Sequence, residues 1–178
     1  MPVVMIGRHL PGLPVHSVRG DAAEAGRLAA ELMLQGGGRR FGIITGPDEL
    51  STILERQNAI QVLLEQAGLA PSMIQDGHLT SDGGYNAALD IMRRPTPPDS
   101  LLCLTDVMAL GAMDAIRHRL GMRVPQDVAV IGFDDIAEVG HSVGSAYPSG
   151  LLISSVTHSS SRLRDGAKII SFPTDTNP

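Results

Sequence analysis

Residues 140–144 read Gly-His-Ser-Val-Gly, which fits the G-x-S-x-G pattern of a hydrolase nucleophile elbow. In such an elbow a strand runs directly into the serine and a helix leaves directly after it. Here the preceding apolar strand ends near Asp134, and Pro148 follows too soon for a helix to begin at once. A triad would also need an acid and then a histidine downstream, whereas His158 precedes the later acids. We therefore predict no catalytic residue and keep an α/β esterase that uses Ser142 as the least favoured alternative.

A second group of candidate residues lies at the ends of the apolar runs of the chain. Within those runs nearly every residue is apolar, and polar residues gather where each run ends. These ends are Gly46-Pro47-Asp48, Gly77-His78-Leu79, Thr105-Asp106 and Asp134-Asp135. In an open parallel sheet, ligands bind beyond the carboxyl ends of the strands. The pattern therefore predicts a cleft for a small polar ligand.

Several of these residues have a structural interpretation beside the functional one. Asp106 is expected to cap the helix that follows it. Asp134 and Asp135 should point to opposite sides of their strand, so only one of them can face a cleft. Arg56 lies in the first turns of a predicted helix, where the helix dipole disfavours a cation. Its planar guanidinium could clamp a ligand, or it could pair with a nearby acid such as Glu55.

Composition excludes several classes of protein. The chain has 178 residues, 43% hydrophobic and 19% charged, which is typical of a globular protein. A net charge of −5 argues against a surface that neutralises DNA phosphates. The single cysteine, Cys103, cannot form an intrachain disulfide or a cysteine-rich metal site. No metal-ligand spacing, phosphate-binding loop, membrane span or secretory leader is visible, so we expect no metal, no cofactor, no membrane contact and a cytoplasmic location.

Apolar runs alternate with helical patterns along the whole chain. Strands are expected at about residues 2–7, 40–46, 72–77, 100–105 and 127–134, with an extended segment at 151–156. Helices are expected at about residues 21–35, 52–67, 82–94, 106–120 and 159–170. Asp21 with Glu24 and Thr52 with Glu55 have the spacing of capping boxes. Such alternation predicts an α/β fold with a doubly wound parallel sheet.

One segment carries a more specific signal than these patterns. The run "CLTDVMALGAMDAIRHRLGMRVPQDVAVIGFDD" resembles the effector-binding domain of the lactose-repressor (LacI) family of bacterial transcription regulators. Upstream, "PVVMIGR", "SVRGDAAEAGRLAAELMLQGGGRRFGIITGP" and "ERQNAIQVLLEQAGL" are similar to the same family. Downstream, "ISSVTHSSSRLRDGAKII" resembles its crossover strand and following helix. The resemblance covers about residues 2–170.

The resemblance implies which residues would bind an effector. Arg56 matches the helix arginine that contacts effector hydroxyls, and Asp134 matches a carboxylate that faces the ligand. Leu79 stands where the family often has an aromatic for stacking a sugar ring. Thr105 stands where an asparagine is common, and His158 where a glutamine is usual. These three departures point away from a typical hexose.

The resemblance also implies an architecture of two α/β lobes with the effector between them, a periplasmic-binding-protein-like fold. Residues 1–38 would be a remnant of the N-terminal lobe and 39–150 a complete C-terminal lobe, with 151–171 the crossover strand and helix and 172–178 a tail. The expected function is effector sensing. A bound sugar-like metabolite would control operator DNA through a helix-turn-helix that this chain lacks, in a homodimer. A transport-type sugar-binding protein remains the alternative.

Overall fold

The computed structural model describes residues 3–7, 12, 15–134, 153–154 and 167–170, the last two ranges by their backbone alone. Strands are β1 Val4–Ile6, β2 His16–Val18, β3 Phe41–Thr45, β4 Pro71–Asp76, β5 Ser100–Cys103, β6 Ala129–Phe133, β7 Ile153–Ser154 and β8 Ala167–Ile170. Helices are α1 Ala22–Gln35, α2 Ser51–Gln66, α3 Ser81–Met92 and α4 Asp106–Asp114, which continues as the π-helical turn η1 Ala115–Arg119. Across these ranges no helix combines the length and the apolarity that a membrane crossing requires.

Six strands form the main sheet, in the order β4-β3-β5-β6-β8-β7. Strands β4, β3, β5 and β6 are parallel, which confirms the predicted parallel α/β sheet. The last two strands run antiparallel, β8 to β6 and β7 to β8. Because β3 lies between β4 and β5, the chain moves outward to β4 and then back across β3 to reach β5. This reversal creates a topological switch point between β3 and β5.

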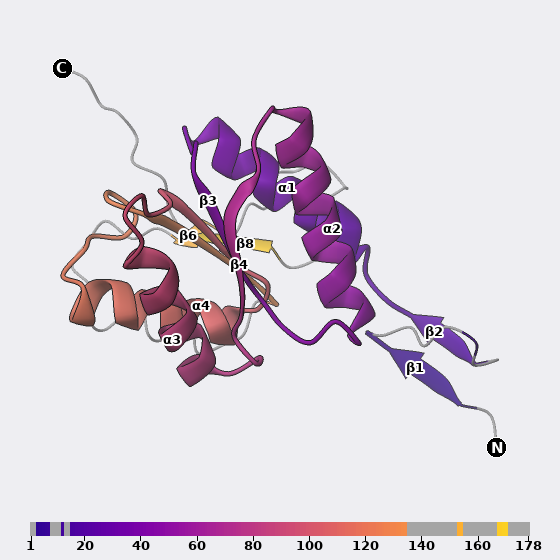
Figure 1. Cartoon of the computed structure of the whole chain (residues 1–178). Coiled ribbons are helices and arrows are strands. Elements are labelled where there is room, and N and C mark those ends of the chain that lie inside the picture. The colour runs from indigo at the N-terminus through magenta and orange to yellow at the C-terminus, as the bar shows by residue number, and fades with distance from the viewer. Residues whose placement is uncertain (1–2, 8–11, 13–14, 135–152, 155–166, 171–178) are drawn as a thin grey trace.

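Helices cover both faces of the sheet, with α1 and α2 on one side and α3 and α4 on the other (Figure 1). Every residue of β3, β5 and β6 is buried, as expected for parallel strands covered on two faces. Phe41, Ile43, Leu102 and Phe133 are among the side chains that are fully buried in this core. On its side of the sheet, α1 packs against α2.

Strands β1 and β2 form a separate parallel pair that lies away from the main sheet (Figure 1). Val4 pairs with His16 and Ile6 with Val18, which places these four side chains on one face of the pair. The three apolar members of this face are strongly exposed, with 84% of Ile6 accessible to solvent. A parallel pair of this size needs covering elements for stability of its own.

Two local predictions from the sequence are corrected, and one strand was missed. Residues 159–170 were expected to form a helix, but 167–170 form strand β8, because they pair along the open side of β6 and two β-branched isoleucines suit a strand. Helix α2 begins at Ser51 with Leu50 as its N-cap, and no side chain caps it, so the Thr52 capping box is wrong. Strand β2 was not anticipated. By contrast, Asp21 caps α1 as predicted and accepts a hydrogen bond from the Glu24 amide at 2.9 Å.

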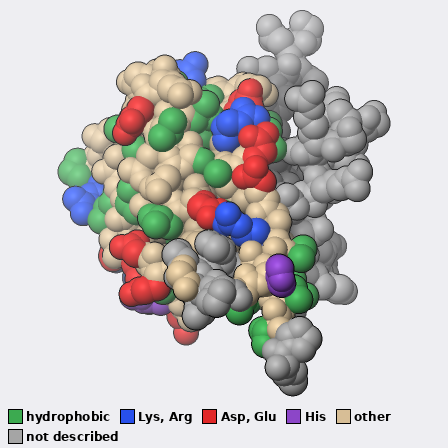
Figure 2. All heavy atoms as spheres, turned by 90° about the vertical axis from the view of Figure 1, so that its right-hand side faces the viewer, with side chains coloured by type: hydrophobic (Ala, Val, Ile, Leu, Met, Phe, Trp, Pro, Cys, Tyr) green, Lys and Arg blue, Asp and Glu red, His purple; other side chains and the backbone are tan. Residues whose placement is uncertain are grey.

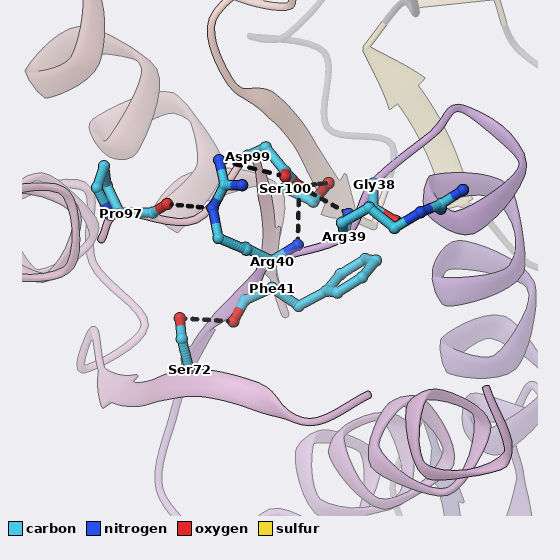
Figure 3. Close-up of polar contacts among 8 residues, drawn as sticks. All are labelled: Gly38, Arg39, Arg40, Phe41, Ser72, Pro97, Asp99 and Ser100. Atoms are coloured by element: carbon cyan, nitrogen blue, oxygen red, sulfur yellow. Dashed lines mark hydrogen bonds and ion pairs between the residues drawn. The ribbon is translucent and has the colours of Figure 1, made fainter. Parts of the chain in front are cut away.

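At the amino ends of β3 and β5 a polar network surrounds Asp99 (Figure 3). Oδ1 of Asp99 accepts hydrogen bonds from the backbone amides of Arg39 and Arg40, at 3.0 and 3.1 Å. The same oxygen accepts from the Ser100 hydroxyl at 3.0 Å. The Arg40 guanidinium donates to the Pro97 carbonyl at 2.9 Å and lies 3.5 Å from the other Asp99 oxygen. Asp99 therefore fixes the entry of the chain into β3 against the start of β5.

Replacing Asp99 by alanine should lower the free energy of unfolding by about 1–3 kcal/mol, because two backbone amides and one guanidinium lose a charged acceptor. Urea denaturation measures this change. Asp90→Ala, at an exposed position near the end of α3, is the matched control and should stay within about 0.5 kcal/mol of the parent chain. Equal midpoints for the two variants would contradict the role of Asp99.

The turn before β6 is held by a second carboxylate. Asp127 accepts hydrogen bonds from the backbone and the guanidinium of Arg123, at 2.6 to 2.9 Å. These bonds lower the pKa of Asp127 from 3.8 to about 2. Because the folded pKa lies below its ordinary value, the carboxylate stabilises the fold above pH 3.8, and this contribution is lost as the pH falls through about 2.

An NMR titration of the Asp127 carboxyl carbon should therefore give a midpoint near pH 2, well below the ordinary 3.8. Arg123→Gln should move that midpoint upward, because the largest cause of the shift is the hydrogen bonding of the Arg123 side chain. Arg94→Gln, at an exposed site after α3, should leave it in place. An unchanged midpoint in Arg123→Gln would show that the carboxylate has another partner in solution.

Candidate functional site

The strand ends that the sequence predicted to share one edge of the sheet do so, at the carboxyl ends of β3, β4, β5 and β6. Gly46 follows β3, Gly77 follows β4, Leu104 follows β5 and Asp134 follows β6. The backbone ties these ends together, because the amide of Leu104 donates to the Ile44 carbonyl at 2.9 Å. Since β3 and β5 flank the switch point, this edge is where an open α/β sheet binds a ligand.

Arg56 reaches from the second turn of α2 to this edge. Its Nη1 donates a hydrogen bond to the carbonyl of Leu104 at 2.8 Å. Its Nη2 lies 3.0 Å from Oδ1 of Asp134 and forms an ion pair with it. The guanidinium carbon lies 4.7 Å from the centre of the Phe133 ring, which is close enough for a cation–π contact. The structure thus brings together Arg56 and Asp134, which are 78 positions apart in sequence.

The two members of this ion pair differ in exposure. The Arg56 side chain is 16% exposed, whereas the Asp134 side chain is 40% exposed. Nε of Arg56 is buried and has no hydrogen-bond partner among the described residues. Arg56 is therefore held on three sides by the protein, and Asp134 is the partner that solvent can reach.

The alternative pairing of Arg56 with Glu55 is wrong. Glu55 instead accepts a hydrogen bond from the guanidinium of Arg19, which comes from the segment between β2 and α1. Adjacent residues on a helix point about 100° apart, so Glu55 and Arg56 take partners from different elements.

Backbone strain is concentrated at the same edge. His78, Leu79 and Asp134 have positive φ angles of 52°, 55° and 105°, and they are the only non-glycine residues with positive φ in the described ranges. Such conformations cost on the order of 1–3 kcal/mol each and often mark binding sites. Asp76 supports the first of them, because its carboxylate accepts from the His78 amide at 2.7 Å and lies 3.0 Å from the His78 imidazole.

Leu79 is half-buried and packs over the end of β3. A Cβ atom added to Gly46 would lie 2.5 Å from Cδ2 of Leu79, so the leucine occupies the space that a side chain at that position would need. Leu79 therefore presents an aliphatic surface at the strand ends.

Thr105, and not Asp106 as the sequence predicted, caps helix α4. Thr105 is the N-cap of α4, and its hydroxyl accepts from the Met108 amide at 3.4 Å. Asp106 is the first residue of the helix and is 2% exposed, so the prediction that it caps α4 is wrong. The reason is packing: Oδ1 of Asp106 lies against Gly132 of β6, where a Cβ atom would come within 2.4 Å of it.

Other predicted residues lie outside the described ranges. They are His158, Asp135 and Ser142, and their roles stay predictions. Conversely, sequence reasoning missed Phe133 and the Leu104 carbonyl as supports of Arg56. The aromatic residue directly before Asp134 was a usable signal, whereas a backbone carbonyl leaves no trace in residue types.

The described part of this edge is suited to binding. No group of three or more His, Cys, Asp or Glu residues able to hold a metal occurs in the described ranges. Cys103, at the end of β5, is completely buried, and this burial raises the pKa of its thiol, so the thiolate nucleophile is suppressed. Around Arg56 this edge presents an oriented cation, the accessible carboxylate of Asp134 and the aliphatic surface of Leu79.

Comparison with known proteins identifies this arrangement. Residues 30–146 match the family model of the periplasmic binding protein-like domain. The transcriptional repressor CytR of Escherichia coli K12 is 34% identical over 137 residues, which is 76% of this chain and 40% of the repressor. The chain thus spans about 40% of the length of that relative.

Solved structures of LacI-family regulators and of a binding protein are also similar to this chain. A sugar-binding transcriptional regulator of the LacI family from Escherichia coli, complexed with phosphate, has a TM-score of 0.70 at 31% identity. That match covers 79% of this chain and 51% of the other. A Caulobacter myo-inositol binding protein bound to myo-inositol has a TM-score of 0.68 at 30% identity, covering 76% and 48%. The chain therefore belongs to the periplasmic binding protein-like family, in the form of the effector-binding domains of LacI-type transcriptional regulators.

Proposed function

We propose that this chain is the effector-sensing part of a LacI-type transcriptional regulator and binds a small polar, sugar-like metabolite at the carboxyl edge of its main sheet. The observation that carries the proposal is the position of Arg56, which bonds to the Leu104 carbonyl and to Asp134 at the switch point. Family membership adds support, because the similar E. coli protein CytR is a transcriptional repressor.

In this proposal both charges of the Arg56–Asp134 ion pair bind the effector. The exposed carboxylate of Asp134 accepts hydrogen bonds from ligand hydroxyls, while Arg56 donates to a ligand oxygen. Leu79 supplies an apolar wall, and Thr105 and His158 complete the predicted set. An aliphatic wall in place of an aromatic ring favours a compact polyol over a flat ring that would stack.

Regulation would operate through a population shift between two relative orientations of two lobes. A ligand that binds one orientation more tightly shifts the equilibrium toward it, by no more than the difference in affinity. In this proposal β1 and β2 belong to an N-terminal lobe made from residues 1–38, and residues 39–150 form the C-terminal lobe. Residues 151–171 connect the lobes, and 172–178 form a tail.

Operator DNA would be bound through a helix-turn-helix belonging to the complete regulator, which would act as a cytoplasmic homodimer. The net charge of −5 fits a sensor that does not itself contact DNA.

A second candidate function is a transport-type sugar-binding protein, which the similarity to the Caulobacter myo-inositol binding protein favours. The two candidates share the fold and differ in what the reading frame encodes next to this domain. A helix-turn-helix in the same frame supports the regulator, and a secretory leader supports transport. Sequencing the region upstream of residue 1 decides between them.

Binding is tested by thermal unfolding in the presence of D-ribose or myo-inositol at millimolar concentrations, with D-glucose as the typical hexose for comparison. We expect at least one of these polyols to raise Tm, because a ligand that binds only the folded state stabilises it. Arg56→Ala should abolish the ligand-induced shift. Loss of charge-assisted hydrogen bonds costs about 1.5–3 kcal/mol, which weakens binding roughly 10- to 150-fold.

Arg94→Ala, at an exposed arginine after α3, is the matched control and should keep the full ligand-induced shift. If Arg56→Ala responds to the polyol as the parent chain does, the assignment of Arg56 to the effector site is wrong. If no polyol shifts the parent chain, the proposed ligand class is wrong.

A further inference from the structure

The segment between β2 and α1 contacts α2 at the turn that carries Arg56. Arg19 follows β2 directly, and its Nη1 donates to Oε1 of Glu55, the neighbour of Arg56. The side chains of this ion pair are 36% and 32% exposed, so each is shielded over about two thirds of its surface. Figure 2, which views the molecule from the right-hand side of Figure 1, shows basic side chains lying against acidic ones on this face.

A second contact fixes the same turn. Helix α1 approaches α2 so closely at Gly26 that a Cβ atom there would lie 2.5 Å from the Arg56 carbonyl oxygen and 2.9 Å from its Cα. Both atoms belong to the backbone of Arg56, so no change of side-chain rotamer can move them away. Only glycine permits this approach, and Gly26 therefore sets how near α1 lies to the backbone of Arg56.

The Arg19–Glu55 ion pair and the contact of Gly26 with Arg56 link two parts of the structure. On one side is the β1–β2 pair, which lies apart from the main sheet (Figure 1). On the other side is Arg56, whose guanidinium is bonded to Leu104 and Asp134. Residues 19–26 lead directly from β2 into α1, so a change in the direction of β2 moves Arg19 before it moves any other residue of this connection.

We propose that Arg19, Glu55 and Gly26 are positioning residues that couple the orientation of β2 to the guanidinium of Arg56. When β2 keeps its present direction, Arg19 is paired with Glu55, and Gly26 packs against the backbone of Arg56. The Arg56 guanidinium is then aligned with Leu104 and Asp134. When β2 turns away, the ion pair lengthens and the Arg56 turn is released. This regulation concerns the same site as the proposed effector binding and rests on that function.

The competing interpretation is that Arg19 and Glu55 form an ordinary surface pair. Exposed pairs contribute little to stability, and many contribute nothing measurable. A surface pair would leave the Arg56 guanidinium unaffected when it is broken. The two interpretations therefore differ in what happens to Arg56.

A charge-reversal cycle on the full chain, without any ligand, separates them. The buried Nε–H of Arg56 is the reporter, observed in a ¹H–¹⁵N NMR spectrum and assigned by its disappearance in Arg56→Lys. Arg19→Glu and Glu55→Arg should each speed hydrogen exchange at this Nε–H and at the amides of β2 by about two- to fivefold, the range expected for one partly exposed pair. The double variant Arg19→Glu with Glu55→Arg should restore both rates.

Arg123→Glu is the control, because it breaks an exposed ion pair far along the chain, and it should change neither rate. Unchanged rates in the single variants, or no restoration in the double variant, would overturn the coupling. Since no ligand is present, a failure here is distinct from the absence of polyol binding, which the thermal-shift measurement detects.

The contact at Gly26 is tested by comparison with another close helix contact. At Gly111 of α4 a Cβ atom would lie 1.8 Å from the Ser81 carbonyl oxygen, so Gly111→Ala disturbs the opposite face of the sheet. Both Gly26→Ala and Gly111→Ala should lower Tm. Only Gly26→Ala should shift the Arg56 Nε–H resonance and speed its exchange. Equal effects of the two variants on that resonance would show that Gly26 acts on overall stability alone.

Discussion

A cation that is only 16% exposed has lost much of its hydration, and the structure around Arg56 is organised to compensate for that loss. The Leu104 carbonyl follows β5, the Phe133 ring belongs to the last residue of β6, and the Asp134 carboxylate follows directly after it. They converge on one guanidinium only if β5 and β6 are in register and α2 lies at a fixed height above the sheet. The candidate site therefore depends on the arrangement of the whole main sheet and of α2.

That arrangement follows from the parallel strands. A parallel strand must be covered on both faces, so each connection returns as a helix and all carboxyl ends reach the same edge. The order β4-β3-β5-β6 places the reversal of direction between β3 and β5, and the Leu104 carbonyl lies there. Backbone strain at Leu79 and Asp134 is tolerated at this edge, because the packed sheet beneath it determines where the loops begin.

The sequence predicted the parts of this structure that depend on local chemistry. Continuous apolar runs located β3, β5 and β6, and Asp21 located the start of α1. Long-range packing decided the rest. Residues 167–170 took a strand conformation because β6 offered an open side, and Thr105 replaced Asp106 as the cap because Asp106 is buried beside Gly132. The unfavourable place of Arg56 on its helix indicated a specific partner, but spacing alone favoured Glu55, and the ion pair with Asp134 depends on long-range packing.

The ion pair between Arg56 and Asp134 also limits which effectors are suitable. A simple anion that bound Arg56 would compete with Asp134 and leave that carboxylate without its cation beside a second negative charge. A simple cation would compete with Arg56 for Asp134 and leave a shielded guanidinium unpaired, which is costly. A hydroxyl group avoids both penalties, because it accepts from Arg56 while it donates to Asp134. Insertion of hydroxyls between the two charges thus keeps each charge satisfied, and this is the physical reason to expect a neutral polyol at the edge of the sheet.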